Sequence, residues 1–260
     1  MPKAVLRRVL LPAAILIVLA SLTGAARPSR VHAAEGAPQT VIVALDPAGP
    51  APGSWSCLAS NPSCARHDEW WREALLQSPA PAGARVRFSP LGSGFAADAE
   101  LAEAVLWVWT WPDGRQLLRT AAAHGVTARF RVFAASQGRA EAAARYDART
   151  RTVEIDPRFA GAPSWLLGDV LAHELTHAAQ DSAGQRLDAG PAGCVPTELP
   201  ARRNEVAYAG YLIDQLGAPP PDAAGALTSS GFELYRMLQG LLASSDLPGL
   251  VAQLCAAQTG

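Results

Sequence analysis

The stretch "LAHELTHAAQ" at residues 171–180 constrains this chain more than any other. A leucine recurs at every fourth position from 167 to 175, which predicts a helix with an apolar stripe facing a core. His173 and His177 are also four residues apart, so a helix places both rings on one face, where each can direct a nitrogen at a single ion. Glu174 falls beside them, in the position of a general base. The pattern predicts a metal site, and a chance occurrence on an ordinary amphipathic helix is the alternative.

The ends of this helix and its neighbours can also be predicted. Ser164 follows a proline and is expected to be the N-cap, and Gly184 is a natural end. Upstream, the alternating stretch "EAAARYDARTRTVEIDP" predicts an antiparallel hairpin that turns near Asp147 to Thr150. Downstream, residues 185–197 are expected to form a loop, and a further helix is expected from Glu198, with a threonine cap before it and a proline in its first turn.

The other expected elements follow from periodicity and from turn residues. Proline, aspartate and glycine at 112–114 predict a turn. Strands are expected at 40–47, 85–89, 127–134 and 151–156, and helices at 67–77, 98–109, 115–125, 231–243 and 247–257. This pattern predicts an α+β fold: a small mixed or antiparallel sheet packed on the helix of the histidines, followed by a helical C-terminal part.

Length and charge limit the partners. A chain of 260 residues can form one sizeable core, and we expect a single domain over residues 36–260, with 36–112 as a part of uncertain status. The formal net charge is -1, and no block of like charges occurs. Nucleic-acid grooves and basic membrane-binding faces need concentrated lysine and arginine, so we expect no nucleic-acid partner.

The first 35 residues form an expected export segment. A basic start with Lys3 and two arginines precedes an apolar run from Val9 to Leu22, and small residues follow it. Cleavage is expected after Ala26 or near Ala33. The alternative is an uncleaved N-terminal anchor, because the uncharged run just reaches a spanning length. In either case the remainder is expected outside the cytoplasm, secreted or anchored.

The four cysteines fit an oxidising compartment. Cys57 and Cys64 are close in sequence, whereas Cys194 and Cys255 are far apart. Three pairings exist, and we favour Cys57 with Cys64 and Cys194 with Cys255. No C-x-x-C pair occurs, so the cysteines are not expected to bind zinc.

The hairpin "ARYDARTRTVEID" followed by the helix "SWLLGDVLAHELTHAAQ" resembles the zincin metallopeptidases, in which an edge strand borders the cleft above the zinc helix. The stretch "LLRTAAAHGVTARFRV" before it is similar to small exported zincins of unassigned substrate. The resemblance covers roughly Leu117 to Gly217, and its specific part is the five-residue motif. It implies a zincin-like fold, Zn²⁺ as cofactor, a peptide or protein substrate, and hydrolysis of peptide bonds.

The third metal ligand depends on the zincin branch. The metzincin pattern would need glycine at 180 and histidine at 183, where this chain has Gln180 and Ala183, and no histidine follows His177. The resemblance then implies the gluzincin branch, in which a glutamate on a later helix completes the site. Glu198 in "ELPA" is favoured, and Glu205 in "NEVAY" is the alternative. Because they are seven residues apart on a helix, the one that does not ligate can orient a histidine.

Peptide hydrolysis also needs a donor for the developing oxyanion. Tyr208, Tyr211, Tyr146 and His124 are candidates, and Tyr208 is the one nearest the expected ligand helix. In this reading Glu174 is the general base, and the substrate adds as a strand to the edge formed by "RTVEID".

Two other functions remain open. One is a non-catalytic exported binding protein, in which a structural or degenerate metal site holds the fold and the tryptophans of "WVWTW" bind sugar or a partner. The spacing before them is helical, however, which favours core packing for these tryptophans. The other is a zinc hydrolase that acts on a non-peptide amide. A serine hydrolase is not indicated, because the sequence has no G-x-S-x-G motif.

Overall fold

A computed structural model describes residues 40–44, 84–89, 91, 94–132, 142–187, 190–216 and 229–259. The chain divides into two units, Met1–Gly36 and Ala37–Gly260, and every described residue belongs to the second. The export segment, the expected helix at 67–77 and the pair Cys57 and Cys64 lie outside the described residues. No helix among the described residues combines the length and apolarity needed to cross a membrane.

The described strands form one mixed six-stranded sheet in the order β1-β2-β3-β4-β6-β5. Their bounds are β1 Thr40–Ala44, β2 Arg85–Ser89, β3 Ala96–Asp98, β4 Thr127–Phe130, β5 Ala144–Asp147 and β6 Thr152–Ile155. The α+β class is therefore confirmed. The first three strands share the sheet with the last three, so the described parts of residues 36–112 belong to the same fold as the rest.

The predicted hairpin is present, because β5 and β6 pair antiparallel with Asp147 opposite Thr152. The strand expected at 127–134 is present as β4, and it pairs parallel with β6. This arrangement arises because β5 takes the outer position and the hairpin then returns β6 alongside β4, in the direction of β4. Consequently β6 is an interior strand and β5 is the edge.

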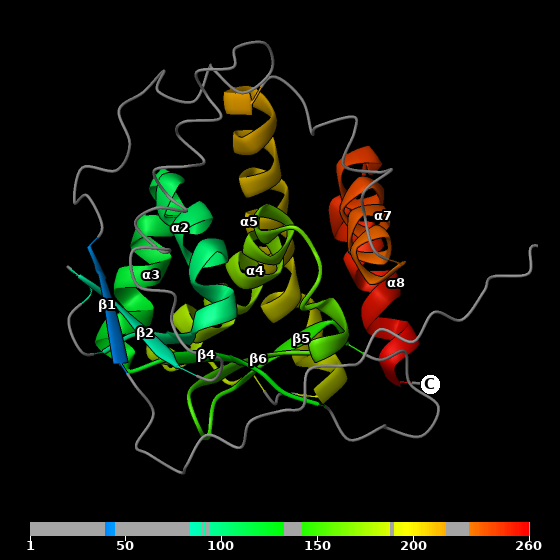
Figure 1. Cartoon of the computed structure of the whole chain (residues 1–260). Coiled ribbons are helices and arrows are strands. Elements are labelled where there is room, and N and C mark those ends of the chain that lie inside the picture. The colour runs from blue at the N-terminus through cyan, green and yellow to red at the C-terminus, as the bar shows by residue number, and fades with distance from the viewer. Residues whose placement is uncertain are drawn as a thin grey trace, which may run out of the picture. The chain divides into compact units, whose positions relative to one another are not determined.

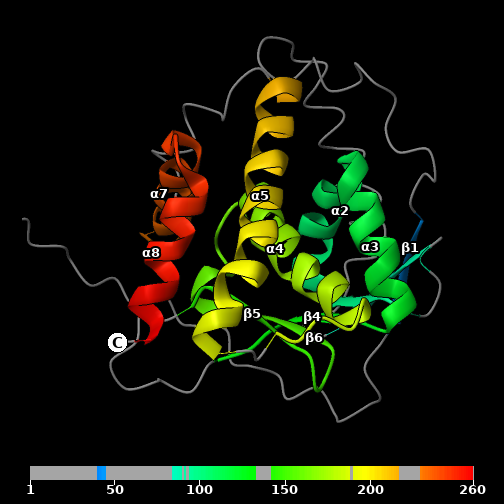
Figure 2. The same cartoon turned by 180° about the vertical axis from the view of Figure 1, so that it is seen from behind.

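All described helices lie on one side of this sheet (Figures 1 and 2). After the 3₁₀ turn Ala99–Leu101, their bounds are α2 Ala102–Thr110, α3 Pro112–His124, α4 Ser164–Ser182, α5 Gly190–Leu216, α7 Ser229–Ala243 and α8 Leu247–Thr259. The expected turn at 112–114 is instead the first turn of α3, because a proline at the first helical position needs no N–H donor. Trp109 and Trp111 are buried in the core, and Trp107 packs against it.

Helix α4 is the centre of the structure and contacts α2, α3 and α5. Its leucine stripe is fully buried as predicted. The expected N-cap was wrong by one residue: Pro163 is the N-cap, and its carbonyl accepts hydrogen bonds from the amides of Leu166 and Leu167. Gly184 follows the helix with a φ of 77°, in the left-handed region that glycine adopts most readily.

Helix α5 differs most from expectation. It begins at Gly190 rather than near Glu198, and it contains Pro196 and Pro200 within its length. The prolines suggested a loop because each removes one helical hydrogen bond. In the structure, two glutamine side chains donate hydrogen bonds to carbonyls in this part of α5. Gln180 on α4 donates to Thr197, and Gln185 just after α4 donates to Pro196.

The sheet face opposite the helices carries a buried ionic cluster. Glu154 lies between the buried Val153 and Ile155 on β6 and faces the other way, as strand geometry requires. Three arginines fully bury its side chain: one on β4, one directly after β4 and one on β5. Burial alone would raise its pKa, but hydrogen bonds from these three arginines, Arg129, Arg131 and Arg145, lower the pKa of Glu154 to about 2.

Acid should therefore remove part of the stability. The pKa of Glu154 is lower in the folded chain than its ordinary value of 4.5, so its contribution is complete above pH 4.5 and disappears as the pH falls towards 2. We expect E154Q to be less stable than the wild type by on the order of 2–3 kcal/mol at pH 7, with the difference shrinking below pH 4.5. Urea unfolding at a series of pH values measures this. A difference that does not change with pH would contradict it.

Close packing of α4 on α5 gives a second prediction. A Cβ on Gly168 would lie 2.4 Å from the hydroxyl of Tyr208, so G168A should lower the free energy of unfolding by about 1–3 kcal/mol. Gly210 on α5 has open space around it, so the matched variant G210A should raise stability by up to about 1 kcal/mol. Thermal or urea unfolding compares the two, and equal stability of both variants would refute the contact.

Candidate metal centre

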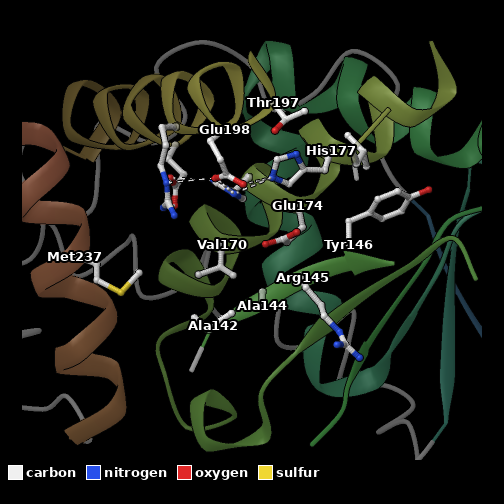
Figure 3. A pocket seen from close by; sticks show the side chains of 15 residues that line it. Ala142, Ala144, Arg145, Tyr146, Val170, Glu174, His177, Thr197, Glu198 and Met237 are labelled. Carbon is white, nitrogen blue, oxygen red and sulfur yellow. Dashed lines mark hydrogen bonds and ion pairs between the residues drawn. The ribbon is translucent and has the colours of Figure 1, made fainter. Parts of the chain in front are cut away.

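Three side chains from α4 and α5 converge on one point. The Nε2 atoms of His173 and His177 are 3.1 Å apart. The Glu198 carboxylate lies across from both, with one oxygen 3.5 Å from Nε2 of His173 and the other 3.5 Å from Nε2 of His177. The three ligand atoms lie within 4.8 Å of one another. Figure 3 shows the carboxylate of Glu198 directed at the ring of His177, with Glu174 nearby.

These distances suit a single zinc ion. Two ligand atoms that are each 2.0–2.1 Å from a tetrahedral ion lie about 3.3 Å apart, and the two Nε2 atoms are 3.1 Å apart. Glu198 presents a different oxygen to each histidine, each 3.5 Å from the facing Nε2 atom. Two imidazole nitrogens and a carboxylate oxygen are a common zinc donor set. The surroundings favour a cation as well, because the carboxylates of Glu198 and Glu205, whose pKa values are lowered, outnumber the guanidinium of Arg202.

Glu198 is held as a carboxylate. Burial opposes its charge, but contacts with His173 and His177 outweigh burial and lower the pKa of Glu198 well below its ordinary value. Its side chain is 25% exposed, compared with 8% for His173. A partly exposed anion at the end of two buried histidines leaves one side of the centre open to a ligand.

Glu174 has the properties of a proton acceptor. It is buried, and its Oε2 atom has no hydrogen-bond partner among the described residues. Burial is the main cause that raises the pKa of Glu174. The side chain lines the same cavity as the three candidate ligands. An unpaired buried carboxylate has a high energetic cost, and such costs are typical of functional sites.

Glu205 occupies a different position from Glu198. One of its oxygens lies 3.1 Å from Nδ1 of His173, on the side of the ring that faces away from His177. Arg202 donates two hydrogen bonds to the Glu205 carboxylate, at 2.7 and 3.0 Å. The structure therefore groups Glu198 with the two histidines and leaves Glu205 where it can orient His173. Burial tends to lower the pKa of His173, but the Glu205 and Glu198 carboxylates raise it to about 10.

Sequence reasoning missed several residues of the centre. Asp169 lies one helical turn before His173 and is buried, with its Oδ1 atom lacking a partner among the described residues. Burial, followed by the charge of Glu205, raises the pKa of Asp169 well above its ordinary value. Its spacing of four residues from His173 was the available signal. Arg202 also lines the cavity, and no sequence pattern singled it out.

A cavity of about 410 Å³ opens over the candidate ligands. The edge strand β5 and the residues before it form one wall, through Ala142 to Tyr146. Apolar side chains from three other segments also line it: Val170 and Met237, which Figure 3 labels, and Leu187. The expectation that a substrate adds to "RTVEID" was wrong, because β6 is paired on both sides. The unpaired edge beside the cavity belongs to β5.

The four candidate oxyanion donors are bonded elsewhere. Tyr208 is fully buried, and its hydroxyl donates to the carbonyl of Trp165. The Tyr211 hydroxyl donates to the carbonyl of Thr110. Tyr146 lines the cavity, but its hydroxyl points away from the histidines (Figure 3) and donates to Asp181 at 2.9 Å, where His124 also bonds. This placement gives Tyr208 a packing role and does not bring its hydroxyl into the cavity.

Comparison with known proteins adds no relative. The chain matches no protein-family model, no curated protein and no solved structure. The chemistry of the centre is therefore inferred from its own residues.

The start of α5 is covalently fixed. Cys194 and Cys255 form the predicted disulfide, which joins α5 to α8 four residues before Glu198. The sequence separation is 61 residues, and the chain-entropy relation gives roughly 4 kcal/mol for a loop of that size. We expect the double variant C194S/C255S to lose about 3–4 kcal/mol of unfolding free energy, measured by urea titration. Wild type treated with a reductant is the control and should lose at least the same amount, because the reductant also breaks any bond between Cys57 and Cys64. Unchanged stability in both would contradict the prediction.

Proposed function

We propose that this chain is an exported zinc-dependent peptidase with a zincin-like fold, in which His173, His177 and Glu198 hold the ion. The observation that carries the proposal is the convergence of three ligand atoms beside the buried carboxylate of Glu174, whose Oε2 atom has no hydrogen-bond partner among the described residues. A centre that only stabilised the fold would need no free carboxylate beside it. The arrangement therefore favours a catalytic site over a structural one.

Zinc, when bound, supplies a Lewis acid that polarises a carbonyl and lowers the pKa of water. Glu174 takes a proton from the attacking water and later delivers it to the nitrogen of the leaving amine. Burial supports this role, because it raises the pKa of Glu174 and makes the carboxylate a stronger base. The alternation of one carboxylate between base and acid requires no second titrating group at the cleaved bond.

The edge strand supports a peptide as the substrate. Strand β5 borders the cavity, and its outer side is unpaired among the described strands. An extended peptide can pair with such an edge, which brings successive carbonyl groups past Glu174 and the proposed ion. The disulfide supports an oxidising compartment, in agreement with an export segment at residues 1–35.

The first experiment combines metal content with cleavage of a mixed peptide library. We expect one zinc per wild-type chain and cleavage of peptides. E174Q should keep the zinc and lose about 10²–10⁴-fold in cleavage rate, because the ligands remain and the base does not. The matched variant E100Q, at an exposed glutamate outside the cavity, should behave as wild type. Full activity in E174Q would sink the proposed mechanism.

Ligand variants extend the same experiment. E198A should lose the zinc, whereas E205A should retain it with weaker affinity, because Glu205 contacts the far side of the His173 ring. If E205A alone loses the metal, the ligand assignment is wrong. A folded wild type that takes up no zinc would refute the enzyme. Zinc without peptide cleavage would favour a structural site or a hydrolase acting on another amide.

A further inference from the structure

Gln180 contacts both halves of the candidate centre. It lies on α4, three residues after His177, and is buried. Its Oε1 atom is 2.8 Å from Nδ1 of His177. Its Nε2 atom donates to the backbone carbonyl of Thr197 at 2.9 Å, and Thr197 directly precedes Glu198. One amide therefore bridges a histidine ligand on α4 and the segment of α5 that carries the glutamate.

The Thr197 carbonyl determines how this amide is oriented. A backbone carbonyl can only accept, so the NH₂ group of Gln180 must face Thr197 and its oxygen must face His177. An oxygen that only accepts requires a proton on Nδ1 of His177. The neutral ring then has its lone pair on Nε2, which is the nitrogen that faces His173 and Glu198. The tautomer needed for metal binding thus follows from a main-chain contact on another helix.

A neighbouring contact fastens the same part of α5. Pro200 has no N–H, so the carbonyl of Pro196, four residues before it, has no helical donor. Gln185, just after α4, donates to this carbonyl at 3.4 Å. Gln180 donates to the next carbonyl, that of Thr197. Two glutamines from one region therefore fasten the proline-containing part of α5, and only Gln180 also contacts a candidate ligand.

We propose that Gln180 is a positioning residue of the metal centre: it fixes the Nδ1–H tautomer of His177 and holds the segment of Glu198 in register with it. The inference rests on the proposed function, since it concerns the affinity of that centre for zinc. It does not give Gln180 a direct contact with the ion or the substrate. Its consequence is that removing the amide weakens zinc binding although all three ligands remain.

The test measures zinc affinity of the full chain by chelator competition. Q180L removes both hydrogen bonds and places an apolar side chain of similar size at this buried position. Q185L is the matched control, because it removes the neighbouring bond to α5 without touching His177. We expect Q180L to weaken zinc binding by about 10–100-fold, and Q185L to change it by less than about threefold.

Two additions separate positioning from general stability. Q180E keeps an acceptor for Nδ1 of His177 but cannot donate to Thr197, so its zinc affinity should fall less than that of Q180L. Ring ¹⁵N shifts of His177 in the zinc-free protein should report Nδ1–H in the wild type and Q180E. In Q180L they should report a mixture of tautomers. A purely structural role for Gln180 would change unfolding alone and leave these shifts unaltered.

The outcomes distinguish this inference from the proposed function. If the wild type binds one zinc and Q180L binds it as tightly as Q185L does, the inference fails and the enzyme proposal stands. If Q180L does not fold, Q180E decides, and wild-type zinc affinity in Q180E refutes the bridge to Thr197. If the folded wild type binds no zinc, both proposals fall together.

Discussion

The structure depends on a cluster of charged and polar groups buried between α4 and α5. Two imidazoles and several carboxylates lie beside the leucine stripe of α4, where water is excluded. Groups of this kind are costly to bury unless each finds a partner. Most of them do: Glu205 accepts from Arg202, Thr176 accepts from Asn204, and Gln180 serves two groups. Oδ1 of Asp169 and Oε2 of Glu174 have no hydrogen-bond partner among the described residues, and Glu174 lines the cavity over the candidate ligands.

The close approach of the two helices makes this cluster possible. Gly168 leaves room on α4 for Tyr208, and Ala201 on α5 is fully buried. Small residues at such contacts allow short side chains on one helix to reach groups on the other, as Asn204 reaches Thr176. The proline-containing part of α5 is tied to the α4 region as well, because carbonyls near the prolines accept hydrogen bonds from Gln180 and Gln185.

The sequence was sufficient for features with a local cause. The four-residue spacing of leucines and histidines predicts α4 and two ligands, and the alternating stretch predicts the β5–β6 hairpin. Glu198 was favoured, but spacing alone does not separate it from Glu205, because seven residues on a helix return nearly to the same face. Which glutamate reaches Nε2 depends on how α5 crosses α4. Strand β3 was missed because "AAD" has no strand propensity, and it exists only through its pairing with β2 and β4. The burial of Tyr208 likewise follows from the helix crossing.

The disulfide between Cys194 and Cys255 links the candidate metal centre to the order in which the chain is made. Synthesis proceeds from the N-terminus, so His173, His177 and Glu198 are all made before Cys255 of α8. The segment before Glu198 can therefore be tethered only after Cys255 has been made. A chain that stopped short of α8 would contain every candidate ligand without that tether, so the covalent fixation of α5 depends on a helix that supplies no candidate ligand itself.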